Sequence, residues 1–226
     1  MKKWTTIDTA LMPDGETISL HEHDGTYSVR IDGAELMSTR RHASEEKIAE
    51  LACAHVHNTR KARVLIGGLG FGFTLTAALA CLRPDASITI AEISPAVVAW
   101  NRDPALPLAS EALADPRVSI ALRDVGDIIG ESAEAFDSII LDVDNGPAAF
   151  STGANRRLYD FAGLRRTRAA LRPRGCAAYW SAASDPAFEK LMTRAGFEVD
   201  LQRCRPHAGS GGRHTLFIGR AAAVRI

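Results

Sequence analysis

The sequence predicts an α/β fold in which helices cover both faces of a mainly parallel sheet, with a small β-meander in front. A β-branched run at 64–66 leads into a glycine turn at 67–72 and then into an alanine- and leucine-rich segment with helical spacing. After this unit, strand-like and helix-like segments alternate regularly. Before it, short β-like runs alternate with turn signals. We therefore predict a meander with the start of a linking helix at 1–50, and a main domain at 51–226.

The expected meander consists of short β-like runs at 17–20, 27–31 and 34–37, separated by Asp-Gly turn signals. A meander of this size cannot bury a core of its own, so it must pack on the main domain or on a partner subunit. We expect it to bury a face in a homodimer. A linking helix should follow from Ser44, its predicted N-cap, to about His57.

The main domain is expected to contain seven strands, and the last two are joined by a Gly/Ser-rich loop without a helix. Such neighbours are most simply antiparallel, because a parallel pair needs a long crossover. Six parallel strands with a reversed last strand form the Rossmann-like sheet of transferases that use S-adenosyl-L-methionine (AdoMet). Asp137 is expected in the turn before its strand. The later predicted strands lie at 87–93, 118–122, 136–141, 176–181, 197–202 and 214–219, and the later helices at 96–101, 110–113, 155–171 and 185–195.

Composition excludes several classes of partner. Lys plus Arg and Asp plus Glu both number 27, so no net field favours nucleic acid or an anionic membrane. No apolar run approaches the ~20 residues that span a bilayer, and the N-terminus lacks an apolar signal core, so we expect a cytoplasmic protein. The histidines lack metal-ligand spacing, and no metal is expected. Four dispersed cysteines are expected to be reduced and mostly buried: Cys53, Cys81, Cys176 and Cys204.

The glycine turn is the first candidate binding element. Glycine permits positive φ and leaves no Cβ in the way of a close ligand, and the following helix N-terminus carries partial positive charge. The alternative is that these glycines serve only tight strand-to-helix packing. A nicotinamide enzyme is a weaker alternative, because Phe73 stands where the third glycine of G-x-G-x-x-G would pack. The predicted cofactor-binding glycines are Gly67, Gly68, Gly70 and Gly72.

Acidic side chains follow the predicted strands at the edge where ligands bind in such sheets. Glu92, next to Ile93, comes about 20 residues after the turn, where an acid can hold two ribose hydroxyls. Asp124, next to Val125, either accepts from the exocyclic amine of adenine or caps a helix. Asp142 would face the reacting group. On the acceptor side, Tyr159 and Trp180 either line the pocket or belong to the core.

Several motifs together resemble the spermidine-synthase-like proteins over residues 15 to 219: GGLGFGFTL, AEISPAVVAWNR, DPRVSIALRD, LDVDNGP and AAYWSA. The resemblance implies a nucleoside site between meander and core, and usually a dimer or larger assembly. True synthases transfer the aminopropyl group of decarboxylated AdoMet to putrescine. The resemblance further implies that Glu92 holds ribose, that Asp124 holds adenine, and that Asp142 lies beside the attacking amine.

The chain departs from that family at points that bear on the reaction. Gly70 stands where the synthases carry an Asp, which attracts the donor's ammonium group and repels the carboxylate of intact AdoMet. After Asp142 a second acid, Asp144, is near but shifted, and a tyrosine is missing around Ala43–Glu45. We expect a transferase that uses an AdoMet-type sulfonium nucleoside, acts on a small acceptor such as an amine, and has Asp142 and Asp144 as catalytic residues. Gly70 favours methyl transfer. Aminopropyl transfer, and a non-catalytic nucleoside-binding or dimerisation protein, remain the alternatives.

Overall fold

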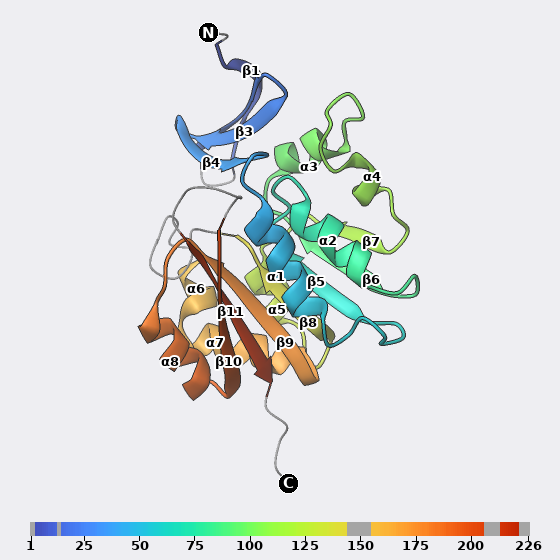
Figure 1. Ribbon diagram of the computed structural model, residues 1–226, viewed down its shortest axis with the longest axis vertical. Coiled ribbons are helices and arrows are strands. Elements are labelled where there is room, and N and C mark those ends of the chain that lie inside the picture. The colour runs from blue at the N-terminus through green and yellow to red at the C-terminus, as the bar shows by residue number, and fades with distance from the viewer. Residues whose placement is uncertain (1–2, 13–14, 144–154, 206–212, 222–226) are drawn as a thin grey trace.

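The computed structural model describes residues 3–12, 15–143, 155–205 and 213–221. It contains an N-terminal antiparallel meander and a seven-stranded mixed sheet with helices on both faces. Figure 1 shows the meander at one end of the main sheet, next to the carboxyl ends of its parallel strands. The meander strands are paired in chain order: β1 (Thr5–Leu11), β2 (Thr17–His23), β3 (Thr26–Ile31) and β4 (Ala34–Ser38).

Strand β1 was not predicted from the sequence. Nearly all of its residues are exposed, so it lacks the alternation of apolar and polar residues that marks a half-buried strand. The other three strands correspond to the predicted runs.

The main sheet has the order β10-β11-β9-β8-β5-β6-β7. Strand β11 is antiparallel to both neighbours, β9 and β10, and the remaining neighbours are parallel. The predicted fold class, six parallel strands with a reversed last strand behind a meander, is therefore confirmed. The strands are β5 (Arg63–Gly67), β6 (Ser87–Ala91), β7 (Val118–Ala121), β8 (Phe136–Leu141), β9 (Leu171–Ser181), β10 (Phe197–Cys204) and β11 (His214–Ala221).

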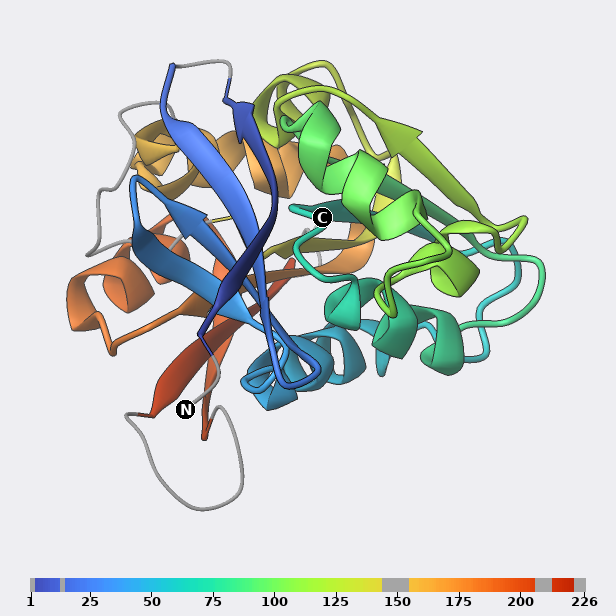
Figure 2. The same ribbon diagram turned by 90° about the horizontal axis from the view of Figure 1, so that it is seen from above.

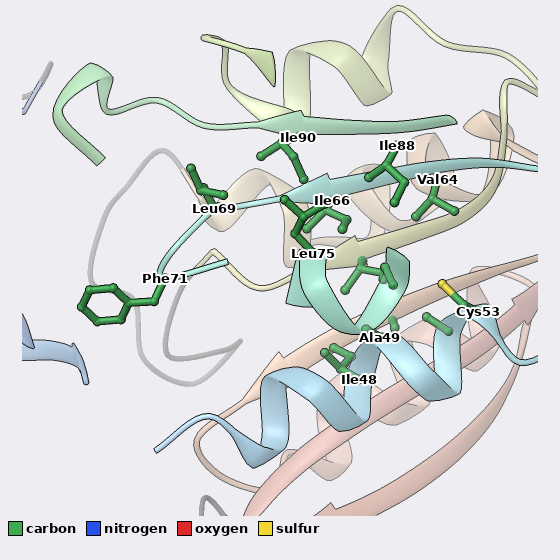
Figure 3. Packing of buried hydrophobic residues seen from close by; sticks show 14 of the residues in the cluster. Ile48, Ala49, Cys53, Val64, Ile66, Leu69, Phe71, Leu75, Ile88 and Ile90 are labelled. Carbon is green, nitrogen blue, oxygen red and sulfur yellow. The ribbon is translucent and has the colours of Figure 1, made fainter. Parts of the chain in front are cut away.

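Two hydrophobic cores lie on opposite faces of this sheet. Along β5, Val64 and Ile66 belong to one core and Leu65 to the other, as the two-residue period of a strand requires. One core is formed with α1 (Ala43–Cys53), α2 (Phe73–Cys81), α3 (Pro95–Arg102) and α4 (Ser110–Leu113). The other is formed with α5 (Val125–Gly130), α6 (Arg156–Tyr159), α7 (Phe161–Ala170) and α8 (Pro186–Arg194). Figure 3 shows side chains of α1, α2, β5 and β6 meeting in the first core.

The meander packs on its own main domain. Ile18, Leu20 and Val29 are at most 2% exposed and belong to the same core as α1 and α2. Trp100 of α3 donates its indole N–H to the Asp8 carboxylate of β1 at 2.7 Å. Seen from above in Figure 2, the meander strands cross over the main domain. The inner face of the meander is thus buried within one chain, which is one of the two packings considered from the sequence.

Three local predictions were wrong. The N-cap of α1 is His42, and Ser44 lies inside the first turn, fully buried. The helix predicted at 155–171 is two helices, because Asp160 leaves the helical conformation and its carboxylate caps α7 at Gly163 N. Asp137 lies within β8, not in the turn before it, where its carboxylate accepts from Arg63 N and from the guanidinium of Arg172.

The predicted state of the cysteines is confirmed. All are free; Cys53 and Cys176 are buried, while Cys81 and Cys204 are partly buried. In the described ranges, no helix combines the length and apolar character needed to cross a membrane.

Candidate active site

A pocket of about 290 Å³ lies where the meander meets the carboxyl edge of the main sheet. Strand β4 supplies one wall, and the N-terminus of α1, the glycine turn and the end of β8 supply the others. Many of the residues that line the pocket have aromatic or titratable side chains. The lining includes Glu35, Met37, Arg41, Glu45, Gly70, Phe71, Phe73, Thr74, Asp142, Trp180 and His214. A larger, open hollow of about 660 Å³ is lined entirely by residues of the meander and its N-terminal end, away from this edge.

The glycine turn is held close to the end of β8. Gly68 has φ +86°, and a Cβ there would lie 2.4 Å from the carbonyl oxygen of Asp142, so only glycine allows this approach. Gly72 is similarly enclosed, because a Cβ added there would lie 2.3 Å from the Cβ of Ala109. Gly70 differs, because its Cβ position meets only Met37 Sδ, at 3.5 Å. Gly70 therefore faces the meander wall of the pocket and has room beside it.

Glu92 anchors this turn from the end of β6. Its Oε2 accepts from Leu69 N at 2.9 Å, and its Oε1 accepts from Ser94 N at 2.8 Å. Burial raises the pKa of Glu92, while these backbone N–H groups act in the opposite direction. Glu92 is 8% exposed and does not line the pocket, whereas the adjacent Ile93 is 44% exposed. The carboxylate predicted to hold ribose thus also fixes the glycine turn.

Asp124 acts as the N-cap of α5, the alternative considered from the sequence. Its Oδ1 accepts from Gly126 N at 2.6 Å and lies 3.0 Å from the guanidinium of Arg157. Val125 is buried in the core. Leu122 lies two residues before Asp124, directly after β7, and is 54% exposed. Strand β7 is paired with β6. Together with Ile93, Leu122 leaves apolar surface uncovered along this part of the sheet edge.

Asp142 and Glu45 form a pair of carboxylates in the pocket. The Thr74 hydroxyl donates to Asp142 Oδ2 at 3.0 Å. Burial raises the pKa of Asp142 to about 6, in spite of that hydrogen bond. Burial, followed by the charge of Asp142, raises the pKa of Glu45 to about 7. At neutral pH this arrangement can take up a proton from a bound group, as a general base must.

Glu45 is connected to the far strand β11. The Ser44 hydroxyl donates to Glu45 Oε2 at 2.8 Å and lies 2.9 Å from Nδ1 of His214. The ring of Trp180 packs edge-on against His214, with centroids 4.5 Å apart. Burial and the charge of Arg41 both lower the pKa of His214. Trp180, a predicted acceptor residue, therefore lies in the pocket wall.

Two predicted site residues lie elsewhere or cannot be placed. Tyr159 is 6% exposed and packs against Tyr179 and Phe188 in the core on the α5–α8 face, so it does not line the pocket. Leu158 and Tyr159, the last two residues of α6, are both buried in that core. Asp144, the second predicted catalytic acid, lies outside the described residues.

Sequence reasoning did not assign Arg41, Glu45 or His214 to the site. Glu45 had the ordinary explanation of an acid in the first turn of a helix. Arg41 and His214 lie in no motif, and they reach the pocket only through the packing of the meander on the main domain and of β11 against α1. The resemblance to the synthases includes the segment Ala43–Glu45 and so reaches Glu45, whereas no local pattern could have identified Arg41 or His214.

No family model matches the sequence, and no curated protein matches it in sequence. Solved structures do match. A spermidine synthase from Thermotoga maritima is similar with a TM-score of 0.72 and 17% identity, over 96% of this chain and 73% of that one. A probable spermidine synthase from Corynebacterium glutamicum gives a TM-score of 0.67 and 17% identity, over 97% and 81% of the two chains.

A methyltransferase also matches. The Burkholderia thailandensis 1,6-didemethyltoxoflavin-N1-methyltransferase, solved with S-adenosylhomocysteine, gives a TM-score of 0.57 and 21% identity, over 80% of this chain and 79% of that one. At such identities the matches establish architecture. This chain has the fold that spermidine synthases share with AdoMet-dependent methyltransferases.

Proposed function

We propose that this protein is a transferase that moves a methyl group from AdoMet to a small amine. The observation that carries the proposal is that one pocket holds both an open glycine position, Gly70, and a base, Asp142. A sulfonium donor is intrinsically reactive, so the protein has mainly to align it with a neutral nucleophile.

The donor would lie along the carboxyl edge of the sheet, with its tail in the pocket. Adenosine would contact Glu92, Ile93, Asp124 and Val125, where exposed apolar surface at Ile93 suits an adenine ring. The glycine turn and the N-terminus of α2 would carry the electron-rich tail.

Two features of the pocket favour intact AdoMet over its decarboxylated form. The Gly70 position has no carboxylate to repel that of the donor, and it has open space beside it. Arg41 lines the same pocket, with its guanidinium on the Glu35 carboxylate. A donor carboxylate could share this guanidinium, because Arg has five N–H donors.

The acceptor side favours an amine. The carboxylates of Glu45 and Asp142 attract a cation, and the faces of Phe73 and Trp180 can support it. Once the ammonium has lost a proton, its lone pair can attack the donor carbon in line with the sulfur. Asp142 would orient this nitrogen, and Asp144 is the second proposed catalytic acid.

We further propose that the protein is a homodimer. The meander and its N-terminal end leave apolar side chains exposed although the inner face of the meander is buried, and these are Trp4, Ile7 and Leu11. A two-fold interface would cover them.

The deciding experiment incubates the purified protein with AdoMet, or with decarboxylated AdoMet, and a panel of mono- and diamines, followed by mass spectrometry. We expect a methylated amine and S-adenosylhomocysteine. Formation of spermidine from putrescine and decarboxylated AdoMet would overturn methyl transfer in favour of the aminopropyl alternative. Nucleoside binding without product from any amine would favour the non-catalytic alternative.

A further inference from the structure

The Glu45 carboxylate lines the pocket and accepts a hydrogen bond from a buried serine. It shares the pocket with Asp142, while its Oε2 accepts from Ser44, which in turn contacts His214 Nδ1 at 2.9 Å. Ser44 is fully buried, whereas His214 is only half-buried. A continuous hydrogen-bonded path thus links the Glu45 carboxylate through the buried Ser44 to His214, which lies at the start of β11 and lines the same pocket.

A serine in this position can relay a proton. Its hydroxyl has one proton and two acceptor lone pairs, so it can donate to Glu45 while accepting from Nδ1–H of His214. When Glu45 is protonated, the same hydroxyl can accept from Glu45 and donate to an unprotonated Nδ1. A hydrogen bond that only stabilised α1 would not require a titratable group at each end.

We propose that Glu45 is a second carboxylate of the acceptor site and that Ser44 and His214 carry the acceptor's proton away from it. The inference rests on the proposed function, because only an acceptor that loses a proton during transfer needs such a route. Glu45 would touch the acceptor directly, and Ser44 and His214 would act through it.

In the transfer step the lone pair of the amine forms the new N–C bond. The C–S bond of the donor breaks, and the electron pair of that bond leaves with sulfur as a neutral thioether. The proton that reaches the carboxylate pair is the one that the bound ammonium gives up to free this lone pair, and the methylated nitrogen keeps the positive charge that sulfur loses. Protonated Glu45 passes a proton to Ser44 while Ser44 passes its own to Nδ1 of His214, and the imidazolium releases its Nε2 proton to water.

The electrostatic surroundings fit both halves of this route. Burial raises the pKa values of both carboxyls, and the charge of Asp142 raises that of Glu45 further, so the pair takes a proton more readily than an exposed acid. Burial and Arg41 lower the pKa of His214, so its imidazolium gives up a proton readily. The other titratable groups around Glu45 are Glu35, which pairs with Arg41, Glu46, which pairs with His42, and Lys47 and Cys204.

The first test uses His214→Ala, with Glu46→Gln as control, because Glu46 lies on the same helix but does not line the pocket. With AdoMet and an amine that wild type accepts, we expect turnover of His214→Ala to fall at least tenfold. Its affinity for S-adenosylhomocysteine should stay within about twofold. Added imidazole should restore turnover, and Glu46→Gln should resemble wild type. Ser44→Ala should move the acidic limb of the pH–rate profile upward, because a donor to Glu45 is lost.

The second test measures the titration of Glu45, so it depends neither on turnover nor on a His214 variant that folds. In the ligand-free protein carrying ¹³C-labelled glutamate, the Glu45 carboxyl should titrate well above an ordinary glutamate, and Asp142→Asn should lower its pKa. A Glu45 resonance that does not respond to Asp142→Asn would overturn the pair.

Outcomes for the relay and for the transferase can be told apart. Full turnover by His214→Ala without any dependence on buffer would overturn the relay and leave the proposed function standing. If wild type methylates no amine at all, the proposed function fails and the relay fails with it.

Discussion

The Cβ position of Gly70 lies 3.5 Å from Met37 Sδ, so the glycine turn faces strand β4 of the meander across an ordinary van der Waals gap. At Gly68 and Gly72, two other glycines of the same turn, a Cβ would collide with neighbouring atoms. Gly70 is therefore the position in the turn where a side chain can be added and would enter the pocket.

Gly70→Asp should reverse the choice of donor. Gly70 has φ +53°, a conformation that Asp tolerates better than most residues, so the fold should survive. The new carboxylate would repel that of AdoMet, and one such contact is worth a few kcal/mol at an effective dielectric of ~20. Calorimetric titrations should show wild type binding AdoMet at least as tightly as decarboxylated AdoMet, and the variant with the opposite order and a change of about tenfold or more. A wild type that prefers the decarboxylated donor would contradict the methyl proposal.

Glu92→Ala should weaken nucleoside binding and also loosen the glycine turn. The change removes the acceptor for Leu69 N and Ser94 N, and hydrogen bonds to a charged group contribute about 1.5–3 kcal/mol each. We expect at least tenfold weaker binding of 5′-methylthioadenosine by calorimetry, and a lower melting temperature. Glu131→Ala, which removes a surface carboxylate paired with Arg123, is the matched control. Unchanged nucleoside affinity in Glu92→Ala would remove Glu92 from the site.

Glu45→Gln should become more stable relative to wild type as pH rises. The folded-state pKa of Glu45 is raised from 4.5 to about 7, so folded wild type retains a proton that the unfolded chain has released. The stability from this group is complete below about pH 4.5 and is lost as pH rises through about 7. Glutamine cannot ionise and escapes this loss.

The measurement is the difference in melting temperature between Glu45→Gln and wild type from pH 4.5 to 8, a window set by the two pKa values of Glu45. A relative gain of about 1 kcal/mol or more is expected, or about 2–4 °C for a domain of this size. Glu46→Gln, one residue along α1, is the control. A difference that is flat with pH, or that falls, would contradict the raised pKa.

The protein should be a dimer in solution, held by the outer side of the meander. Ile7 is 43% exposed and Leu11 is 73% exposed on β1, while the inner face of the meander is already used within the chain. Light scattering should give twice the mass of one chain. Ile7→Asp should give a folded monomer, because a charge at an apolar interface is costly. A wild type that stays monomeric at high concentration would exclude the dimer.

The sequence by itself determined most strands of the main sheet, its reversed last strand, and the edge at which the acidic side chains gather, although it missed β1 and the break between α6 and α7. These follow from local signals: the apolar runs of β5 and β8, the glycines of the turn, and the missing helix between β10 and β11. It also placed Glu92, Asp124 and Asp142 correctly at strand ends, because the carboxyl ends of parallel strands share one edge.

Only the tertiary structure decided which side chains share the pocket. Ser44 and His214 are 170 residues apart in sequence and 2.9 Å apart in space, so no local pattern could link them. Tyr159 and Trp180 looked equivalent in sequence, yet Tyr159 packs in the core and Trp180 lines the pocket. Helix α1 turns Glu45 toward Asp142 because Ile48, Ala49 and Ala52 bury the adjacent face against α2 and the sheet, and packing of that kind is decided by the whole fold.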